Sequence, residues 1–382
     1  MKKIYGFGYN AFSQTIPNNR DIIISEPTEI LSTRCTKIMW ANLTMTLGMD
    51  VNLNPIEWGF DGLLNGIKSP TLSNLPQNVK KCFGDDVYGI RGFIDQNGFL
   101  YQDRKIIELS TKCVDVAQCC TGGDVVGITA DGKLWQWNVR ERKEADDDYI
   151  PKPLELNPIE NEIENNFIKV VSGENHFLAL TRNGEVYTWG SGRYGQLGHG
   201  NLKSLNRPTV IEFLQGLTVT EIACGGWHSA VITDSQDLYT FGWNSHGRLG
   251  INMSSSSAIQ NDNNNENDYD SNNNSNRLVT INPAEPNLIE FNREDDVDMD
   301  SDNDLNVLKV SCGSAHTAIV TDDNQLRVCG WGKYGQQGQG PNDLKDQLNF
   351  SKVKFNLPHN GKLVDCICGR WNTFAILIQD ES

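Results

Sequence analysis

The sequence has little that would place the protein in a membrane or send it out of the cell. No apolar run in its 382 residues approaches the ~18 residues that a membrane-spanning helix needs. The start, Met1-Lys2-Lys3, is not followed by the apolar stretch of a secretory signal. We therefore expect an intracellular protein, in the cytoplasm, the nucleus or both, with no membrane partner.

Basic charge is scarce as well. The 33 Lys and Arg residues face 49 Asp and Glu residues, which gives a formal net charge of −16. Residues 261–304 contribute −11 of this charge, from thirteen acids and two bases, so the rest of the chain is close to neutral. The chain has no stripe or arm of Lys and Arg that could neutralise nucleic-acid phosphates. Direct binding to nucleic acid is therefore not expected.

Motifs of catalysis and metal binding are also missing. The chain has no Gly-x-Ser-x-Gly elbow, no Lys-bearing phosphate loop, no His-Glu-x-x-His and no Cys-x-x-Cys. The run from Gly190 to Gly195 superficially matches a dinucleotide-binding fingerprint, but it follows a predicted strand and precedes no predicted helix. We expect a protein that is not an enzyme and holds neither a cofactor nor a metal ion.

What the sequence does contain is an internal repeat of about 50 residues. Each copy has a Gly-containing turn, an apolar alternating segment, a second turn, a second alternating segment ending in Gly, and in most copies a Gly-rich loop. The first turns of the four clearest copies are Ser172–His176, Cys224–His228, Cys312–His316 and Cys368–Asn372. Weaker copies lie at 38–62, 82–101 and 120–138.

The pattern of the repeat predicts its fold. Period-2 alternation and Asn-Gly or Asp-Gly turns are typical of small antiparallel sheets, which must stack to bury both faces. The chain ends after the first strand of a repeat, and residues 5–14 align with residues 187–196. The two termini therefore complete one shared repeat, the seventh. We predict one all-β domain over residues 1–382, a seven-bladed β-propeller with one blade closed by the N- and C-terminal strands.

The repeat resembles that of the regulator of chromosome condensation family. The resemblance rests on runs such as Gly225-Gly226-Trp227-His228 and Tyr194-Gly195-Gln196-Leu197-Gly198. It is strong over about 170–250 and 308–378 and weak over about 1–138. It implies a seven-bladed propeller closed by both termini, and the layout is similar to the stand-alone members without additional domains.

Several repeat positions are interpreted as structural. We expect each histidine to donate to the backbone of the adjoining Gly-Gly turn, and each first-turn glycine to supply a conformation that a side chain would forbid. Three histidines could converge on a metal ion, but the fourth copy has Asn372, which favours the structural role. We expect Trp189, with Phe241 and Trp137, to fill the contacts between blades. The structural positions are Gly173, His176, Trp189, Gly190, Gly225, His228, Gly242, Gly313, His316, Gly330 and Gly369.

Two insertions lengthen one blade, at 252–275 and 292–305. The first is rich in Ser and Asn and the second in Asp, so we expect both to be disordered. Neutral drift of a surface loop and an acidic docking tail for a basic partner such as a histone remain alternatives.

One rim of the propeller is the candidate binding surface. The loops that follow the strands ending in Gly carry aromatic and basic residues, which are common anchors of protein interfaces. The alternative is that these side chains only pack on the next blade. The candidate partner-binding residues are Tyr9, Asn10, Arg193, Trp243, Arg248, Trp331 and Lys333.

Two functions are consistent with these features. The first is a monomeric, non-enzymatic interaction platform for one or more proteins, and the resemblance implies chromatin, cytoskeletal or ubiquitin-related complexes. The second is a guanine-nucleotide exchange factor for a small GTPase of the nuclear-transport type, as in the founding member of the family. The start of this sequence leads straight into a strand without that member's basic tail, and no residue maps onto a nucleotide-displacing wedge.

Overall fold

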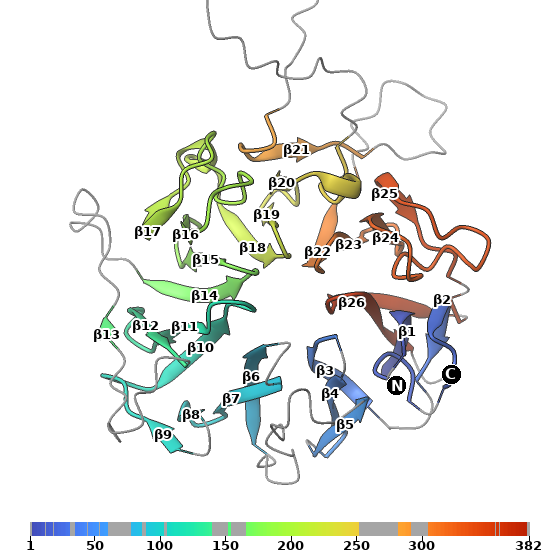
Figure 1. Ribbon diagram of the computed structural model, residues 1–382, viewed down its shortest axis with the longest axis horizontal. Helices are drawn as coiled ribbons and strands as arrows, with labels where there is room; N and C mark the ends of the chain where they lie inside the picture. The colour runs from blue at the N-terminus through green and yellow to red at the C-terminus, as the bar shows by residue number, and fades with distance from the viewer. Residues whose placement is uncertain are drawn as a thin grey trace, which may run out of the picture.

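The computed structural model describes residues 2–59 apart from 12, 18, 31–34, 44 and 53. It further describes 78–85, 89–102, 105–139, 152–153, 166–251, 282–291 and 305–379 apart from 356 and 359. The strands form seven sheets arranged radially around a central axis (Figure 1). The predicted seven-bladed propeller is therefore confirmed. Both predicted insertions lie outside the described residues, except for Leu305 at the end of the second.

Each blade runs from an inner strand at the axis to an outer strand at the periphery (Figure 1). Blade 1 consists of β3 (Cys35–Ala41), β4 (Met45–Asp50) and β5 (Pro55–Gly59). Blade 2 consists of β6 (Val79–Asp85), β7 (Gly89–Asp95), β8 (Leu100–Gln102) and β9 (Lys105–Ile107). Blade 3 consists of β10 (Cys113–Gln118), β11 (Asp124–Thr129), β12 (Leu134–Asn138) and β13 (Lys152–Pro153). Blades 4 and 5 are β14 (Phe167–Ser172), β15 (His176–Thr181), β16 (Val186–Gly190) and β17 (Leu205–Val210), then β18 (Val219–Cys224), β19 (His228–Thr233), β20 (Leu238–Gly242) and β21 (Asn287–Ile289). Blade 6 is β22 (Val307–Cys312), β23 (His316–Thr321), β24 (Leu326–Gly330) and β25 (Gln347–Lys352), and blade 7 is β26 (Gly361–Cys368), β27 (Asn372–Gln379), β1 (Lys2–Tyr9) and β2 (Ile23–Glu29). Two 3₁₀ turns of the described residues, η3 (Glu212–Leu214) and η4 (Ser245–Gly247), lie in the connections.

Blade 7 joins the two ends of the chain. Strand β1 lies between β27 and β2 and pairs antiparallel with both. Tyr5 is opposite Ala375 and Gly8 is opposite Asn372, which is the register that the alignment of residues 5–14 with 187–196 predicts. Ring closure by the terminal strands is therefore confirmed.

Large side chains fill the space between neighbouring blades. Trp189, Phe241 and Trp137 are 2%, 0% and 4% exposed. Each belongs to a buried cluster that includes residues of the blade before its own; Trp189, for example, shares its cluster with Val126 and Ala117 of blade 3. Full burial of such a ring is worth roughly 2–3 kcal/mol, so these contacts hold the blades in fixed orientations.

The histidines of the first turn join blades in a way that the sequence did not predict. His176 Nε2 lies 3.0 Å from Ser229 Oγ, His228 Nε2 lies 2.8 Å from Thr317 Oγ1, and His316 Nε2 lies 3.0 Å from Thr373 Oγ1. Each partner hydroxyl belongs to the next blade, so the expected bond to the adjoining Gly-Gly turn is wrong.

The hydroxyl partners also fix the tautomer of each ring. Ser229 Oγ donates its hydrogen to the carbonyl of Gln196, and the hydroxyls of Thr317 and Thr373 donate in the same way to Arg248 and Gln336. A hydroxyl has one hydrogen, so it accepts from the imidazole, and each histidine must carry its proton on Nε2. The buried Nδ1 atoms have no hydrogen-bond partner among the described residues. Burial lowers the pKa of His176 and of His316 to about 3, and burial together with the nearby positive charge of Arg248 holds the pKa of His228 well below its usual range.

The first-turn glycines are needed for space and not for an unusual backbone conformation. A Cβ on Gly225 would lie 2.1 Å from Cε1 of His228 and 2.5 Å from the carbonyl oxygen of Gly313 in the next blade. Gly173 and Gly313 are crowded in the same way by the histidines of their own repeats. A side chain is therefore excluded at these positions, as expected, but by crowding and not by a positive φ. A positive φ is found instead at glycines near the ends of third strands, such as Gly190 and Gly242, whose φ values are 103° and 114°.

Candidate interaction surface

Two sets of segments meet on one face of the ring. The turns between first and second strands and the loops after third strands all follow strand ends that point the same way. The loop after β16 is held rigidly, because the buried Gln196 accepts the N–H of Tyr194 at 2.9 Å while Leu197 is 1% exposed. Gln336 accepts the N–H of Tyr334 in the equivalent loop of blade 6, also at 2.9 Å. These loops therefore present their tyrosine rings from fixed backbones.

The first aromatic cluster spans blades 4 and 5. The ring of Tyr194 stacks on Trp243 with centroids 4.7 Å apart and meets Trp227 edge to face at 5.3 Å. Tyr194 is 40% exposed and Trp243 is 39% exposed. Aromatic pairs in these geometries gain attraction in addition to the free energy of burying their surface. The two rings therefore form an apolar patch whose geometry is already fixed at the surface.

The second cluster spans blades 6 and 7 and repeats the first. Tyr334 stacks on Trp371 at 5.1 Å and meets Tyr9 at 5.2 Å. Trp331 extends this cluster toward blade 5, where its ring lies 5.8 Å from that of His246. We call the two clusters together the aromatic rim; its members are Tyr194, Trp227, Trp243, His246, Trp331, Tyr334, Trp371 and Tyr9.

Two of the candidate partner-binding residues are buried and serve the loops. Arg248 is 3% exposed; its Nε donates to the carbonyl of Ser245 at 2.9 Å and its Nη1 to that of Ser314 at 3.0 Å. Burial lowers the pKa of Arg248 to about 10, and its guanidinium lies 4.8 Å from the ring centre of Trp243. Asn10 is 1% exposed and its amide bonds to the backbone of its own loop. Arg248 and Asn10 are therefore corrected from partner-binding to positioning residues, because backbone carbonyls and amides take the place of solvent around their polar groups.

The remaining candidates lie on or beside the aromatic rim. Trp243, Trp331 and Tyr9 belong to it, and Arg193 and Lys333 are exposed in the loops that carry its tyrosines. Whether these residues bind a partner stays a prediction. Trp227 and Trp371 were not predicted as members, although both directly precede the His or Asn of their repeats. That shared position was the signal that could have found them.

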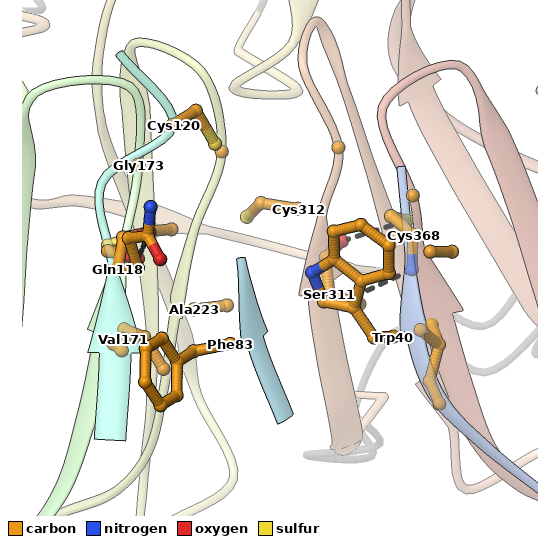
Figure 2. A pocket seen from close by; sticks show the side chains of 18 of the residues that line it. Trp40, Phe83, Gln118, Cys120, Val171, Gly173, Ala223, Ser311, Cys312 and Cys368 are labelled. Atoms are coloured by element: carbon orange, nitrogen blue, oxygen red, sulfur yellow. Dashed lines mark hydrogen bonds between the residues drawn. The ribbon is translucent and has the colours of Figure 1, made fainter. Parts of the chain in front are cut away.

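A cavity of about 640 Å³ lies on the axis of the ring and is lined by the inner strands of all seven blades. We call this axial cavity the channel. Figure 2 shows side chains that line it, among them Trp40, Phe83 and Cys312. All ten cysteines are free, and burial raises the pKa of Cys120 and of Cys368, which line this cavity, to about 12. These thiols are therefore weak nucleophiles. In the part of the chain that the structure describes, no three His, Cys, Asp or Glu side chains gather as metal ligands.

Part of the chain matches family models of a known repeat. The model described as regulator of chromosome condensation (RCC1) repeat matches residues 183–232 and 236–320, and a second model with the same description matches 167–196, 219–248 and 307–336. Residues 167–336 of this β-propeller are therefore similar to the RCC1 repeat.

Solved structures agree with this assignment at the level of the fold. Human WBSCR16 superposes with a TM-score of 0.67 over 100% of both chains at 18% identity. Prp20p from Saccharomyces cerevisiae superposes with a TM-score of 0.70 over 100% of this chain and 92% of its own, at 16% identity.

The chain spans little more than half the length of the curated RCC1 domain-containing relatives that it matches. The human RCC1 domain-containing protein 1 is 33% identical over 214 residues, which are 54% of this chain and 55% of that protein. The mouse protein of the same name is 31% identical over 60% of each chain. Human E3 ubiquitin-protein ligase HERC2 is 33% identical over 232 residues, but the match covers only 4% of that protein. Among the described residues, no helix of this chain has the length and hydropathy needed to cross a membrane.

Proposed function

We propose that this β-propeller is a non-enzymatic platform that binds protein partners through its aromatic rim. The single observation that carries the proposal is the exposure of stacked aromatic rings on fixed loops. Tyr194 and Trp243 are about two-fifths exposed, and no segment among the described residues covers them. Trp and Tyr dominate the binding energy of protein interfaces because they bury large areas at low entropic cost.

The relatives support a role in assemblies. Prp20p was described together with its binding to Gsp1p and histones, and HERC2 carries a related segment within a far larger protein. We propose, by analogy, that this chain acts as an adaptor or regulator in chromatin, cytoskeletal or ubiquitin-related complexes. Free thiols throughout the chain agree with an intracellular home.

Trp243→Ala and Trp331→Ala test the rim. Partners recovered with the intact protein by affinity purification and mass spectrometry should be lost from both variants, while thermal melts stay close to wild type because partly exposed side chains add little to folding stability. Phe99→Ala is the matched control, since Phe99 is 47% exposed in the β7–β8 turn on the opposite face. If all three variants recover the partners equally, the aromatic rim is not the surface that binds them.

The exchange-factor alternative has its own test. Release of labelled GDP from a small GTPase of the nuclear-transport type is measured with catalytic amounts of this protein. We expect no acceleration. A large acceleration at substoichiometric protein would replace the platform by an exchange factor.

A further inference from the structure

A ring of charge surrounds the channel at the end opposite the aromatic rim. Each inner strand has a β-bulge near its start, and each bulge ends on a charged residue. In order around the axis these residues are Lys37, Lys81, Asp115, Lys169, Glu221, Lys309 and Asp365. In each case the unpaired extra residue of the bulge is followed by the charged residue, which resumes the pairing. The same backbone irregularity therefore places one charge per blade at equivalent positions.

Most of the ring is neutralised by alternation of sign. Lys81 Nζ lies 2.5 Å from Asp115 Oδ1, and Glu221 pairs with Lys169 on one side and with Lys309 at 3.8 Å on the other. Burial raises the pKa of Asp365, and the positive charge of Lys309 opposes that shift most strongly.

Seven positions cannot alternate perfectly, and the break falls between blades 1 and 2. Lys37 and Lys81 are neighbours of like sign, so the ring has four positive and three negative members. Lys81 already shares its charge with Asp115. Lys37 is exposed and has no ion-pair partner within the part of the chain that the structure describes. One positive charge therefore remains uncompensated at this point of the channel.

The wall next to this break is apolar. The cavity of about 640 Å³ reaches from Lys37 and Lys81 past Met39, Trp40 and Phe83. Its volume is within the range of sites that enclose a small ligand or a few side chains. The channel thus offers one unpaired cation at its mouth and aromatic and aliphatic surface inside.

We propose that Lys37 and Lys81 bind the carboxylate of an Asp or Glu in a partner peptide, whose neighbouring apolar side chain packs against Trp40 inside the channel. The proposal rests on the protein's role as an interaction platform but uses the face opposite the aromatic rim. A carboxylate matches the single excess charge. A phosphate group, which carries about −1.5 to −2, would exceed it and would be repelled by the flanking Asp115 and Asp365.

Peptide display on the full-length protein tests this assignment. Peptides selected on the wild type should be enriched in an Asp or Glu next to an apolar residue. The enrichment should vanish on Lys37→Glu and persist on Lys133→Glu, a control on the same face whose side chain is 66% exposed outside the channel. No acidic enrichment on the wild type, or equal enrichment on Lys37→Glu, would overturn the proposal.

Binding of one selected peptide, measured by calorimetry, separates the chemistries. Replacing its acidic residue by the amide, or Lys37 by Met, should each weaken binding about tenfold or more, while Lys37→Met leaves the thermal melt unchanged. A phosphoserine in place of the acidic residue should not bind more tightly, and tighter binding would refute the carboxylate assignment. Trp243→Ala should bind this peptide normally, so failure of this site and failure of the rim are distinguishable.

Discussion

The three buried histidines should make this propeller sensitive to mild acid. In the folded protein the pKa of His176 and His316 is about 3 and that of His228 lies well below its usual range, whereas in the unfolded chain each titrates near 6.5. Below pH 6.5 the unfolded state therefore binds protons that the folded state does not. The free energy of unfolding is at its full value above pH 6.5 and falls as the pH drops toward 3.

The size of the effect follows from the number of protons. One proton of difference changes the free energy of unfolding by about 1.4 kcal/mol per pH unit. Between pH 7 and pH 5 each histidine should remove roughly 2 kcal/mol, and the three together roughly 6 kcal/mol. That is a large share of the ~5–15 kcal/mol stability of a typical domain. The ordinary pKa values of Asp and Glu, about 4, lie below this window, so histidine titration dominates the slope within it.

Urea unfolding at half-unit steps from pH 7 to pH 5 measures the slope directly. His228→Asn copies the residue found naturally at Asn372 and should lower the mean slope between pH 7 and pH 5 by about 1 kcal/mol per pH unit, whatever it does to stability at pH 7. Leu178→Ala is the matched control, since Leu178 is 0% exposed and its loss destabilises through packing alone. An identical slope in the wild type and His228→Asn would refute the neutral state of the buried His228 imidazole in the folded protein.

Two further changes test the contacts between blades and the closure of the ring. Gly225→Ala should cost about 1–3 kcal/mol in chemical denaturation, because its Cβ would overlap His228 and the carbonyl of Gly313; wild-type stability would contradict this crowding. Deleting residues 1–15 removes β1 with the buried Ile4 and Phe7 and exposes the edge of β27, so a large fall in melting temperature or soluble yield is expected. An unchanged melt would be inconsistent with a blade shared by the two termini.

The order of the blades could be predicted from the sequence because a repeat carries its own alignment. The alignment of Gly8 with Gly190 placed β1 beside β27 from the sequence alone. The structure confirms the pairing, and both glycines have a positive φ. Contacts between repeats could not be predicted in the same way. The partner of His176 is Ser229, 53 positions along the chain, and only the angle between two blades brings their side chains together.

The candidate surface was predicted in part for a related reason. A loop position shows that a side chain is near the rim, but not whether it points outward. Arg248 and Trp243 lie five positions apart in one loop, yet Arg248 is 3% exposed and Trp243 is 39% exposed. The difference arises because the carbonyl groups of Ser245 and Ser314 are oriented to accept from the guanidinium.

Equivalent positions within this one molecule separate what the fold requires from what it leaves open. The residue after the third-strand glycine makes the same backbone hydrogen bond in four blades, to the residue before the first-turn His or Asn, at 2.7 to 2.9 Å. The side chains at this position nevertheless differ: they are Ser191, Trp243, Trp331 and Tyr9. Because Ser191 keeps the same backbone geometry in blade 4, folding does not require an aromatic ring there. The aromatic rings of blades 5 to 7 are therefore not demanded by the backbone, which is consistent with the partner recognition that we propose for the aromatic rim.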